Sequence, residues 1–399
     1  MPTELARMPR LSGSAARLRP GVFSELQGKI DQAGREGRGL APLHIGDTFL
    51  LPPSASRRAS PEADPALYRY GPTAGLGELR EAIACFVARE RDLPWVREEH
   101  VLVGAGGTHA LHCASRVLFD PGDEIVMLAP FWPLAPGIFE AQGARTVEVV
   151  ASPLLYADPS LDLRSLLEGH VGPKTRAIYF VSPNNPDGKM LGPRHLEEVL
   201  AVAREHDLWV LADEVYADVT YGAPHLSFGT LPGARERSLL LYSFSKSFAL
   251  AGQRVGFLVA PPPLVAAARR ISTHTIFNVP VASQRAALAA LEHGPAFVAE
   301  ARARYKGTRD AVARILAESG VDYTLPEGAV YFFLDLSPRL GTRPLTDLLA
   351  HAIDHGVLLA PGDAFGQAFA RHARLCFTSV PEEETLAGVR ALVRALRSF

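Results

Sequence analysis

The sequence predicts an α/β protein built as a three-layer sandwich around a mostly parallel sheet, with a second, smaller α+β domain after it. Two observations favour this fold. Short apolar runs of strand length alternate with helical patterns over most of the 399 residues, as in sheets covered on both faces. From about residue 280 the pattern changes to longer helices and fewer, more widely spaced strands.

The first fifty residues contain one helical pattern and one short apolar run. Val22, Leu26 and Ile30 recur at helical spacing and predict an amphipathic helix before a glycine-rich stretch. Residues 42–47 are expected to form a strand ending in a glycine and an aspartate. Residues 51–61 are rich in proline and serine, so they indicate a linker.

The next stretch has the pattern of a phosphate-binding turn. Residues 68–75 form a turn-rich loop before a helix, and a strand is expected at 100–103. The glycine-rich segment 104–108 then leads directly into another helix. A strand, glycines and a helix start can bind phosphate, because unpaired N–H groups and the positive end of the helix dipole point at one spot. Two adjacent glycines are also common in turns for steric reasons alone.

Functional groups come directly after four of the strands expected in the middle of the chain. These strands are predicted at residues 124–127, 146–150, 177–181, 209–212, 239–242 and 255–259. Trp132 comes after the first of them, Asn185 after the third, Asp213 after the fourth and Lys246 after the fifth. Because ligands bind at the carboxyl ends of parallel strands, these side chains are expected at one edge of the sheet.

Lys246 stands out because lysine is rare here: the chain has 41 lysines and arginines together, and only five of them are lysines. A primary amine can form a Schiff base with an aldehyde, which a guanidinium cannot. Ser243, Ser245 and Arg254 surround Lys246 with groups that bind phosphate. An aldehyde that carries a phosphate is pyridoxal 5'-phosphate (PLP). The alternative is an ordinary solvated loop lysine.

The chain is expected to divide into three parts. Residues 1–48 form an N-terminal arm and part of the small domain, 49–290 the large PLP-binding domain, and 291–399 the small C-terminal domain. Helices are expected at 284–293 and 297–319, and strands at 329–334, 357–360 and 375–377.

Composition excludes several classes of protein. The formal net charge of -2 gives no electrostatic case for nucleic acid or an anionic membrane surface. No apolar run approaches the roughly 18 residues of a membrane span, and the first twenty residues lack the apolar segment of a secretory signal. Cys85, Cys113 and Cys376 fit neither a disulfide framework nor zinc-ligand spacing. We expect a cytoplasmic protein without a metal site.

Three motifs together resemble the class I/II aminotransferases of PLP-dependent fold type I, the group that includes aspartate aminotransferases. They are Ser-x-Ser-Lys at residues 243–246 with Arg254 after it, Asn-Pro-x-Gly from Asn185, and Asp-Glu-x-Tyr from Asp213. As a set they are far more specific than any one of them. The similarity extends from about Gly46 to Arg374.

The resemblance assigns roles around the cofactor ring. Lys246 corresponds to the Schiff-base lysine, and Asp213 to the carboxylate that pairs with the pyridine nitrogen. Asn185 and Tyr216 correspond to the residues that hydrogen-bond the phenolic oxygen of PLP. Trp132 corresponds to the aromatic residue that stacks on the ring. Asp213, Asn185 and Trp132 also have ordinary structural explanations as a helix cap, a turn residue and a core residue.

The resemblance also assigns the phosphate, the substrate and the partner subunit. The residues that correspond to the phosphate cradle are Ser243, Ser245 and Arg254 together with Gly106, Gly107 and Thr108. Tyr70 corresponds to a tyrosine that reaches the phosphate from the second subunit of a homodimer with shared active sites. Arg374 corresponds to the arginine that grips the substrate α-carboxylate bidentately, with Gly46 and Asn185 beside it. Arg371 lies close by, so a surface ion pair is the alternative for Arg374.

The implied activity moves an amino group between an L-amino acid and a 2-oxo acid by a ping-pong reaction through an aldimine at Lys246. The same residues would serve a PLP-dependent lyase, decarboxylase or oxidase, which is the nearest alternative. A PLP-binding protein without turnover is a more distant one.

Two departures from the family pattern concern the turn and the substrate. Asp187 replaces the threonine of many relatives, where it is expected only to shape the turn. Residues 271–278 can reach a neighbouring active site in relatives, and here there is no arginine between Ile271 and Gln284. We therefore expect Phe277, Tyr331 and Phe332 to line a pocket for a neutral or apolar side chain.

Overall fold

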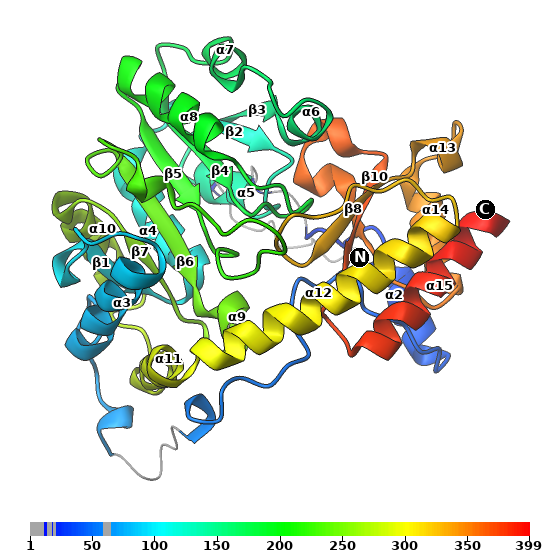
Figure 1. The fold of residues 1–399 in the computed structure, drawn as a ribbon, viewed down its shortest axis with the longest axis horizontal. Helices are drawn as coiled ribbons and strands as arrows, with labels where there is room; N and C mark the ends of the chain where they lie inside the picture. The colour runs from blue at the N-terminus through cyan, green and yellow to red at the C-terminus, as the bar shows by residue number, and fades with distance from the viewer. Residues whose placement is uncertain (1–11, 14–17, 19–20, 59–64) are drawn as a thin grey trace, which may run out of the picture.

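The computed structural model describes residues 12–13, 18, 21–58 and 65–399. A seven-stranded sheet forms the centre of the larger part of the molecule (Figure 1). Its strands are β1 (Val101–Gly104), β2 (Glu124–Ala129), β3 (Arg145–Val150), β4 (Thr175–Val181), β5 (Trp209–Asp213), β6 (Ser238–Ser243) and β7 (Gly256–Val259).

The sheet has the order β1-β7-β6-β5-β4-β2-β3. Neighbouring strands from β6 to β3 pair in parallel. Strand β7 runs antiparallel to both β6 and β1, between which it lies. The prediction of a mostly parallel sheet is confirmed, with one reversed strand that the sequence pattern did not indicate.

Helices cover both faces of the sheet because its strands are apolar on both sides. In β4, Ile178 and Phe180 pack into one core and Tyr179 into the other, as the two-residue period of a strand requires. The first face is covered by α3 (Gly77–Glu90), α6 (Ser152–Ala157), α7 (Leu163–Glu168), α8 (Pro193–Glu205) and α11 (Val281–His293). The second face is covered by α4 (Gly106–Leu118), α5 (Ala135–Glu140) and α10 (Pro262–Thr275).

A smaller α+β unit comes after the long helix α12 (Pro295–Glu318), which runs from the large sheet into it (Figure 1). Its antiparallel sheet has the order β8-β10-β9, with β8 at Tyr331–Asp335, β9 at Ala360–Pro361 and β10 at His372–Cys376. Its helices are α2 (Gln27–Arg35), α13 (Ser337–Leu340), α14 (Leu345–Asp354) and α15 (Glu382–Ser398). These elements share one hydrophobic core.

We propose the predicted division at residues 48/49 and 290/291 as the domain boundaries. Leu291 still packs in a core of the large sheet, whereas Ala301 packs in the core of the small unit. Leu26 and Leu43 belong to the small unit's core as well, which supports assigning part of the N-terminal segment to it.

Several predicted elements begin or end elsewhere. The first helix starts at Gln27 rather than near Val22. Residues 42–47 are not a strand: Ala41 makes one isolated bridge to Val357, and a turn comes next because Pro42 lacks the N–H that pairing requires. The last two strands begin three residues away from their predicted starts, at Ala360 and His372. The end of the predicted linker, residues 59–61, lies outside the described residues.

The predicted strand ends meet at one edge of the large sheet. Strands β2, β4, β5 and β6 are neighbours and point the same way, so the segments after them gather at their carboxyl ends. The small unit closes over this edge through β8 and β10 (Figure 1). Within the described chain, none of the helices combines the length and apolar character that crossing a bilayer requires.

Candidate active site

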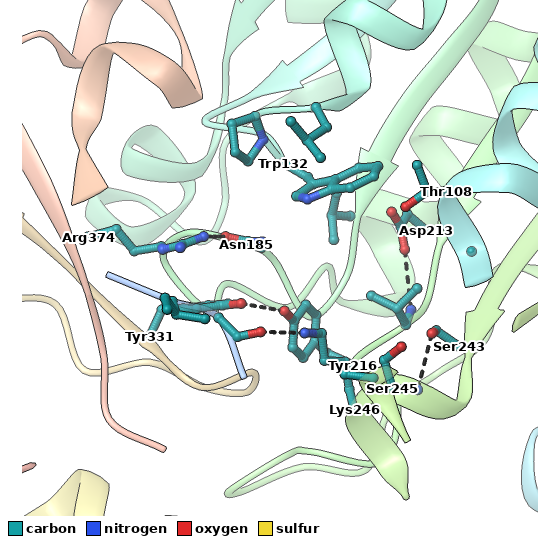
Figure 2. A pocket seen from close by; sticks show the side chains of 18 of the residues that line it. Thr108, Trp132, Asn185, Asp213, Tyr216, Ser243, Ser245, Lys246, Tyr331 and Arg374 are labelled. Atoms are coloured by element: carbon teal, nitrogen blue, oxygen red, sulfur yellow. Dashed lines mark hydrogen bonds between the residues drawn. The ribbon is translucent and has the colours of Figure 1, made fainter. Parts of the chain in front are cut away.

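A cavity of about 400 Å³ opens where the carboxyl edge of the large sheet meets the small unit. Segments from both parts of the molecule form its walls (Figure 2). The predicted site residues that line it are Gly46, Gly107, Thr108, Trp132, Asn185, Asp213, Tyr216, Ser243, Ser245, Lys246, Arg254 and Arg374. The structure therefore brings together residues that are scattered over more than three hundred positions.

Lys246 lies in the short helix α9 (Phe244–Ser247), directly after β6. The Ser243 side chain caps this helix by accepting a hydrogen bond from the Ser245 N–H. Lys246 Nζ reaches across the cavity and donates to the carbonyl oxygen of Gly46. Burial lowers the pKa of Lys246, because a low-polarity surrounding disfavours the ammonium form. The structure thus places a partly desolvated amine in the wall of the cavity.

Asp213 ends β5 at the bottom of the cavity and is 3% exposed. Burial raises the pKa of its carboxyl group to about 7. Two donors oppose this effect: the Tyr179 hydroxyl at 2.9 Å and the Val215 N–H at 3.3 Å. A buried carboxyl group with few hydrogen-bond donors is suited to pair with a cationic N–H group of a ligand. Such a cation would stabilise the ionised form of Asp213.

The turn between β1 and α4 forms a concave surface that only glycine permits. Gly106 has φ +78°, and a Cβ atom there would lie 2.5 Å from the Arg254 guanidinium. A Cβ atom on Gly256 of β7 would collide with the N–H of Gly107. Helix α4 begins without a side-chain cap, so the N–H groups of its first turn have no side-chain acceptor there. Backbone donors and Arg254 thus face one space at the end of the cavity.

Arg374 reaches the cavity from β10 of the small unit (Figure 2). Its guanidinium donates to Asn185 Oδ1 at 2.9 Å and to the carbonyl oxygen of His44 at 2.8 Å. The rings of Tyr331 and Phe365 lie 4.3 and 4.8 Å from its Cζ atom. The Nε atom is buried and has no hydrogen-bond partner among the described residues. A buried guanidinium with an unpaired N–H lacks an acceptor, and a carboxylate is the acceptor that fits it best.

Tyr216 faces the cavity beside Lys246, and its hydroxyl is hydrogen-bonded to that of Tyr331 at 2.5 Å (Figure 2). Burial raises the pKa of the Tyr216 hydroxyl well above its usual value, so the group stays protonated and able to donate. Gly46 passes directly over Tyr331, where any Cβ atom would collide with the hydroxyl. The backbone can approach the cavity there only because the residue is glycine.

Other predicted positions lie away from the cavity. Tyr70 is 86% exposed and packs its ring edge-on against Phe277 at 5.0 Å, so neither lines the cavity in this single chain. Phe332 was also predicted to line it, which is wrong: its side chain points into the core of the small unit. It alternates with Tyr331 along β8, and only Tyr331 faces the cavity.

Asp187 shapes its turn by accepting hydrogen bonds from the Asn184 side chain and the Lys189 N–H.

Several residues that line or support the cavity are not predicted from the sequence. Among them, Tyr179 supports Asp213 from inside β4, and Phe23, His44 and Phe365 line the cavity. Phe23 carried a usable signal, since it is apolar and lies off the Val22, Leu26, Ile30 stripe. Tyr179 lies in a strand, His44 in a turn and Phe365 at the end of a 3-10 helix, where only the three-dimensional fold shows what they face.

Sequence comparison identifies relatives over nearly the whole chain. The family model "Aminotransferase class I and II" matches residues 41–392. The aspartate/prephenate aminotransferase of Thermus thermophilus is 31% identical over 384 residues, covering 94% of this chain and 96% of that protein. An arginine–pyruvate transaminase of Pseudomonas aeruginosa is 34% identical over 345 residues, covering 85% and 86%.

Solved structures agree with the sequence relatives. The aspartate aminotransferase of Thermus thermophilus with maleate superposes with a TM-score of 0.88 at 30% identity, covering 97% of this chain and 100% of that one. An aromatic aminotransferase of Pyrococcus horikoshii superposes with a TM-score of 0.83 at 28% identity, covering 94% and 99%. The chain therefore belongs to the class I and II aminotransferases and is an enzyme that transfers amino groups.

Proposed function

We propose that the protein uses PLP to move an amino group between an L-amino acid and a 2-oxo acid, with Lys246, Asp213 and Arg374 as its central groups. One observation carries this proposal: an amine, a buried carboxylate and a buried guanidinium, from three distant segments, converge on one cavity. Each of them matches a different part of a PLP–amino acid pair. The family to which the chain belongs depends on this cofactor.

The residues of the cavity fit PLP. Glycine at position 106 lets the Arg254 guanidinium pack against the turn, and Arg254 lines the cavity together with Gly107 and Thr108, where a phosphate group can bind. Asp213, Asn185, Tyr216 and Trp132 all line the cavity. Asp213 can accept from a protonated pyridine nitrogen, Asn185 and Tyr216 can donate to a phenolic oxygen, and Trp132 can cover an aromatic ring. Ser243, Ser245 and Thr108 add hydroxyl groups at the phosphate end.

When bound, PLP supplies an electron-poor ring that accepts the electron pair released at the substrate α-carbon. Asp213 would hold the pyridinium N–H and so keep the ring electron-poor. Lys246 Nζ would hold the cofactor by its aldehyde group. The Lys246 amine, once free, would take the proton from the substrate α-carbon and return a proton on the cofactor side, and the lowered pKa of Lys246 raises the share of neutral amine available for this. Arg374 would hold the substrate carboxylate and so orient the substrate toward Lys246.

The reaction is tested by a single half-turnover. Holoenzyme mixed with an amino acid and no 2-oxo acid is expected to change its cofactor absorbance and to release about one equivalent of 2-oxo acid per site. Release of ammonia, carbon dioxide or hydrogen peroxide in place of amino transfer would instead identify a lyase, a decarboxylase or an oxidase on the same scaffold. No spectral change with any amino acid would leave only a PLP-binding protein.

Replacing Arg374 with lysine is expected to raise KM for the amino donor about 100-fold with a smaller change in kcat. Lysine keeps the charge but loses the two-point contact with a carboxylate, which is worth about 2–3 kcal/mol. Steady-state kinetics measure this. Arg371→Lys is the matched control, since Arg371 precedes the same strand, its side chain donates to the carbonyl oxygens of Ser337 and Gly341, and it does not line the cavity. Equal KM values for both variants would refute the role of Arg374.

We propose that the catalytic unit is a homodimer in which Tyr70 contacts the phosphate of the partner's site. The exposed Tyr70 and Phe277 rings form an apolar patch that a second subunit would cover. Activity of Lys246→Ala mixed with Tyr70→Ala after subunit exchange is expected to rise to about a quarter of the wild-type value, because half of the dimers are mixed and each has one complete site. No gain over the sum of the separate variants would mean that Tyr70 does not act between subunits.

A cytoplasmic location is also proposed. All three cysteines are free thiols, and Cys113 and Cys376 are buried. Free thiols persist in a reducing compartment. Cell fractionation with an antibody to the protein tests this location.

A further inference from the structure

Part of the cavity wall consists of side chains that have no assigned contact with the cofactor or the α-carboxylate. We call this group of described residues the second end of the cavity: Val22, Phe23, His44, Ile45, Pro133, Leu134 and Phe365. All but His44 are apolar. A substrate held by its carboxylate at Arg374 and by its amino group near Lys246 has one group left to place, its side chain, for which these residues are the unassigned part of the wall.

Each cation along the described cavity wall already has a proposed partner. Lys246 is assigned to the cofactor aldehyde, Arg254 to the cofactor phosphate and Arg374 to the substrate α-carboxylate. Along the wall formed by the described residues of one chain, a second substrate carboxylate would meet apolar side chains and none of these three cations. Burying an unpaired carboxylate costs several kcal/mol, so this wall disfavours it.

His44 does not supply the missing charge. Burial, together with the nearby Arg374 guanidinium, lowers the pKa of His44 to about 4, so its imidazole is neutral at neutral pH. The Phe23 ring packs edge-on against it, with 4.7 Å between ring centroids. His44 therefore lines the cavity as a neutral imidazole ring.

Two of these apolar side chains are exposed. Leu134 is 51% exposed and Ile45 is 48% exposed, although both line the cavity. Leaving large apolar side chains in contact with water is unfavourable, and covering each of them recovers about 25 cal/mol for every Å² removed from water. An apolar ligand that packs against either of them would gain this free energy.

From these contacts we infer that the amino donor carries an apolar or aromatic side chain, which binds among Phe23, His44 and Leu134. This inference rests on the proposed aminotransferase reaction and narrows its substrate. Phenylalanine, leucine or methionine fit the space by chemistry, whereas aspartate and glutamate do not.

Binding of substrate-like acids to the holoenzyme tests the inference without turnover. Titration calorimetry is expected to give a Kd for 3-phenylpropionate at least about 10-fold lower than that for succinate, because only the first has an apolar group for this end of the cavity. Equal Kd values, or tighter binding of succinate, would overturn the inference.

Turnover gives a second, independent measurement. We expect kcat/KM for phenylalanine or leucine to exceed that for aspartate and glutamate by about 100-fold or more. If aspartate or glutamate is the fastest donor, the substrate class is wrong while the aminotransferase reaction stands. If no amino acid changes the cofactor absorbance, the proposed reaction itself fails, so the two failures are distinguishable.

A lysine at position 134 would add the missing cation. Leu134→Lys is expected to reduce the preference for phenylalanine over aspartate at least about 10-fold, since it provides a partner for the second carboxylate. Leu154→Lys is the matched control, because Leu154 is another exposed leucine, 42% exposed, and does not line the cavity. An unchanged preference in a folded Leu134→Lys protein would show that the side chain binds elsewhere.

Discussion

Replacing Lys246 with alanine is expected to lower kcat by about 10⁴-fold or more, because the variant loses both the amine that binds the cofactor and the group that moves the proton. Lys246→Arg is expected to be just as inactive. A guanidinium stays protonated at all accessible pH values and can neither bind an aldehyde nor accept a proton. Steady-state rates with the best amino donor measure both effects.

A readout other than activity separates loss of chemistry from loss of fold. Borohydride treatment of the PLP-loaded wild type is expected to add the mass of the reduced cofactor to the peptide that contains Lys246, and to no peptide of the alanine variant. Lys306→Ala is the control, since Lys306 lies on α12 and is half exposed in a pair with Asp310. Residual activity of Lys246→Ala within about 10-fold of wild type would contradict the assignment.

Replacing Asp213 with asparagine is expected to have opposite effects on catalysis and on stability. Activity is expected to fall by about 10³-fold, because the pyridine nitrogen loses its anionic partner. The cofactor-free protein, however, is expected to become more stable above neutral pH. Burial raises the pKa of Asp213 to about 7 in the folded protein, whereas a carboxyl group in the unfolded chain titrates near pH 4.

Proton binding by Asp213 sets the direction of this stability change. Between pH 4 and 7 the folded state keeps a proton that the unfolded state has lost, so this group makes stability fall as pH rises through that range. The cost above pH 7 is on the order of 4 kcal/mol, and asparagine removes it. Urea unfolding of the cofactor-free protein at pH 8 and pH 4 measures the difference, which should be large at pH 8 and small at pH 4.

The control for this prediction is Asp207→Asn, because the Asp207 side chain is fully exposed. It is expected to leave both stability and its pH dependence unchanged. If Asp213→Asn were less stable than wild type at pH 8, the carboxylate would be a stabilising group in the cofactor-free protein and the raised pKa would be wrong.

Sequence alone predicted the fold and most of the cavity wall, for a physical reason. Parallel strands place their carboxyl ends together, so Trp132, Asn185, Asp213 and Lys246 were identifiable from their positions just after apolar runs. Only the parallel direction of the strands was needed, and the alternation of strands with helices indicated it. Arg374 was harder, since its strand belongs to another sheet.

The roles of residues inside a strand could not be predicted in this way, because they depend on which face of the sheet each side chain occupies. Tyr179 lies in the middle of β4 and looks like any buried aromatic residue until its hydroxyl is seen beside Asp213. Phe332 was placed in the cavity because it adjoins Tyr331, but adjacent strand residues face opposite sides. His44 lies in a turn where the pattern favoured a strand, so its orientation depended on contacts that the sequence does not reveal.

The reversed strand β7 limits when the large sheet can be completed during synthesis of the chain. Among the described strands it is the one that pairs with β1, and it holds β1 next to β6. A nascent chain that has not yet reached Val259 contains the glycine turn and Lys246 but lacks the strand that joins them. The proposed phosphate-binding end of the site can therefore assemble on the ribosome only after roughly two thirds of the polypeptide has been translated, and until then β1 lacks the strand with which it pairs among the described residues.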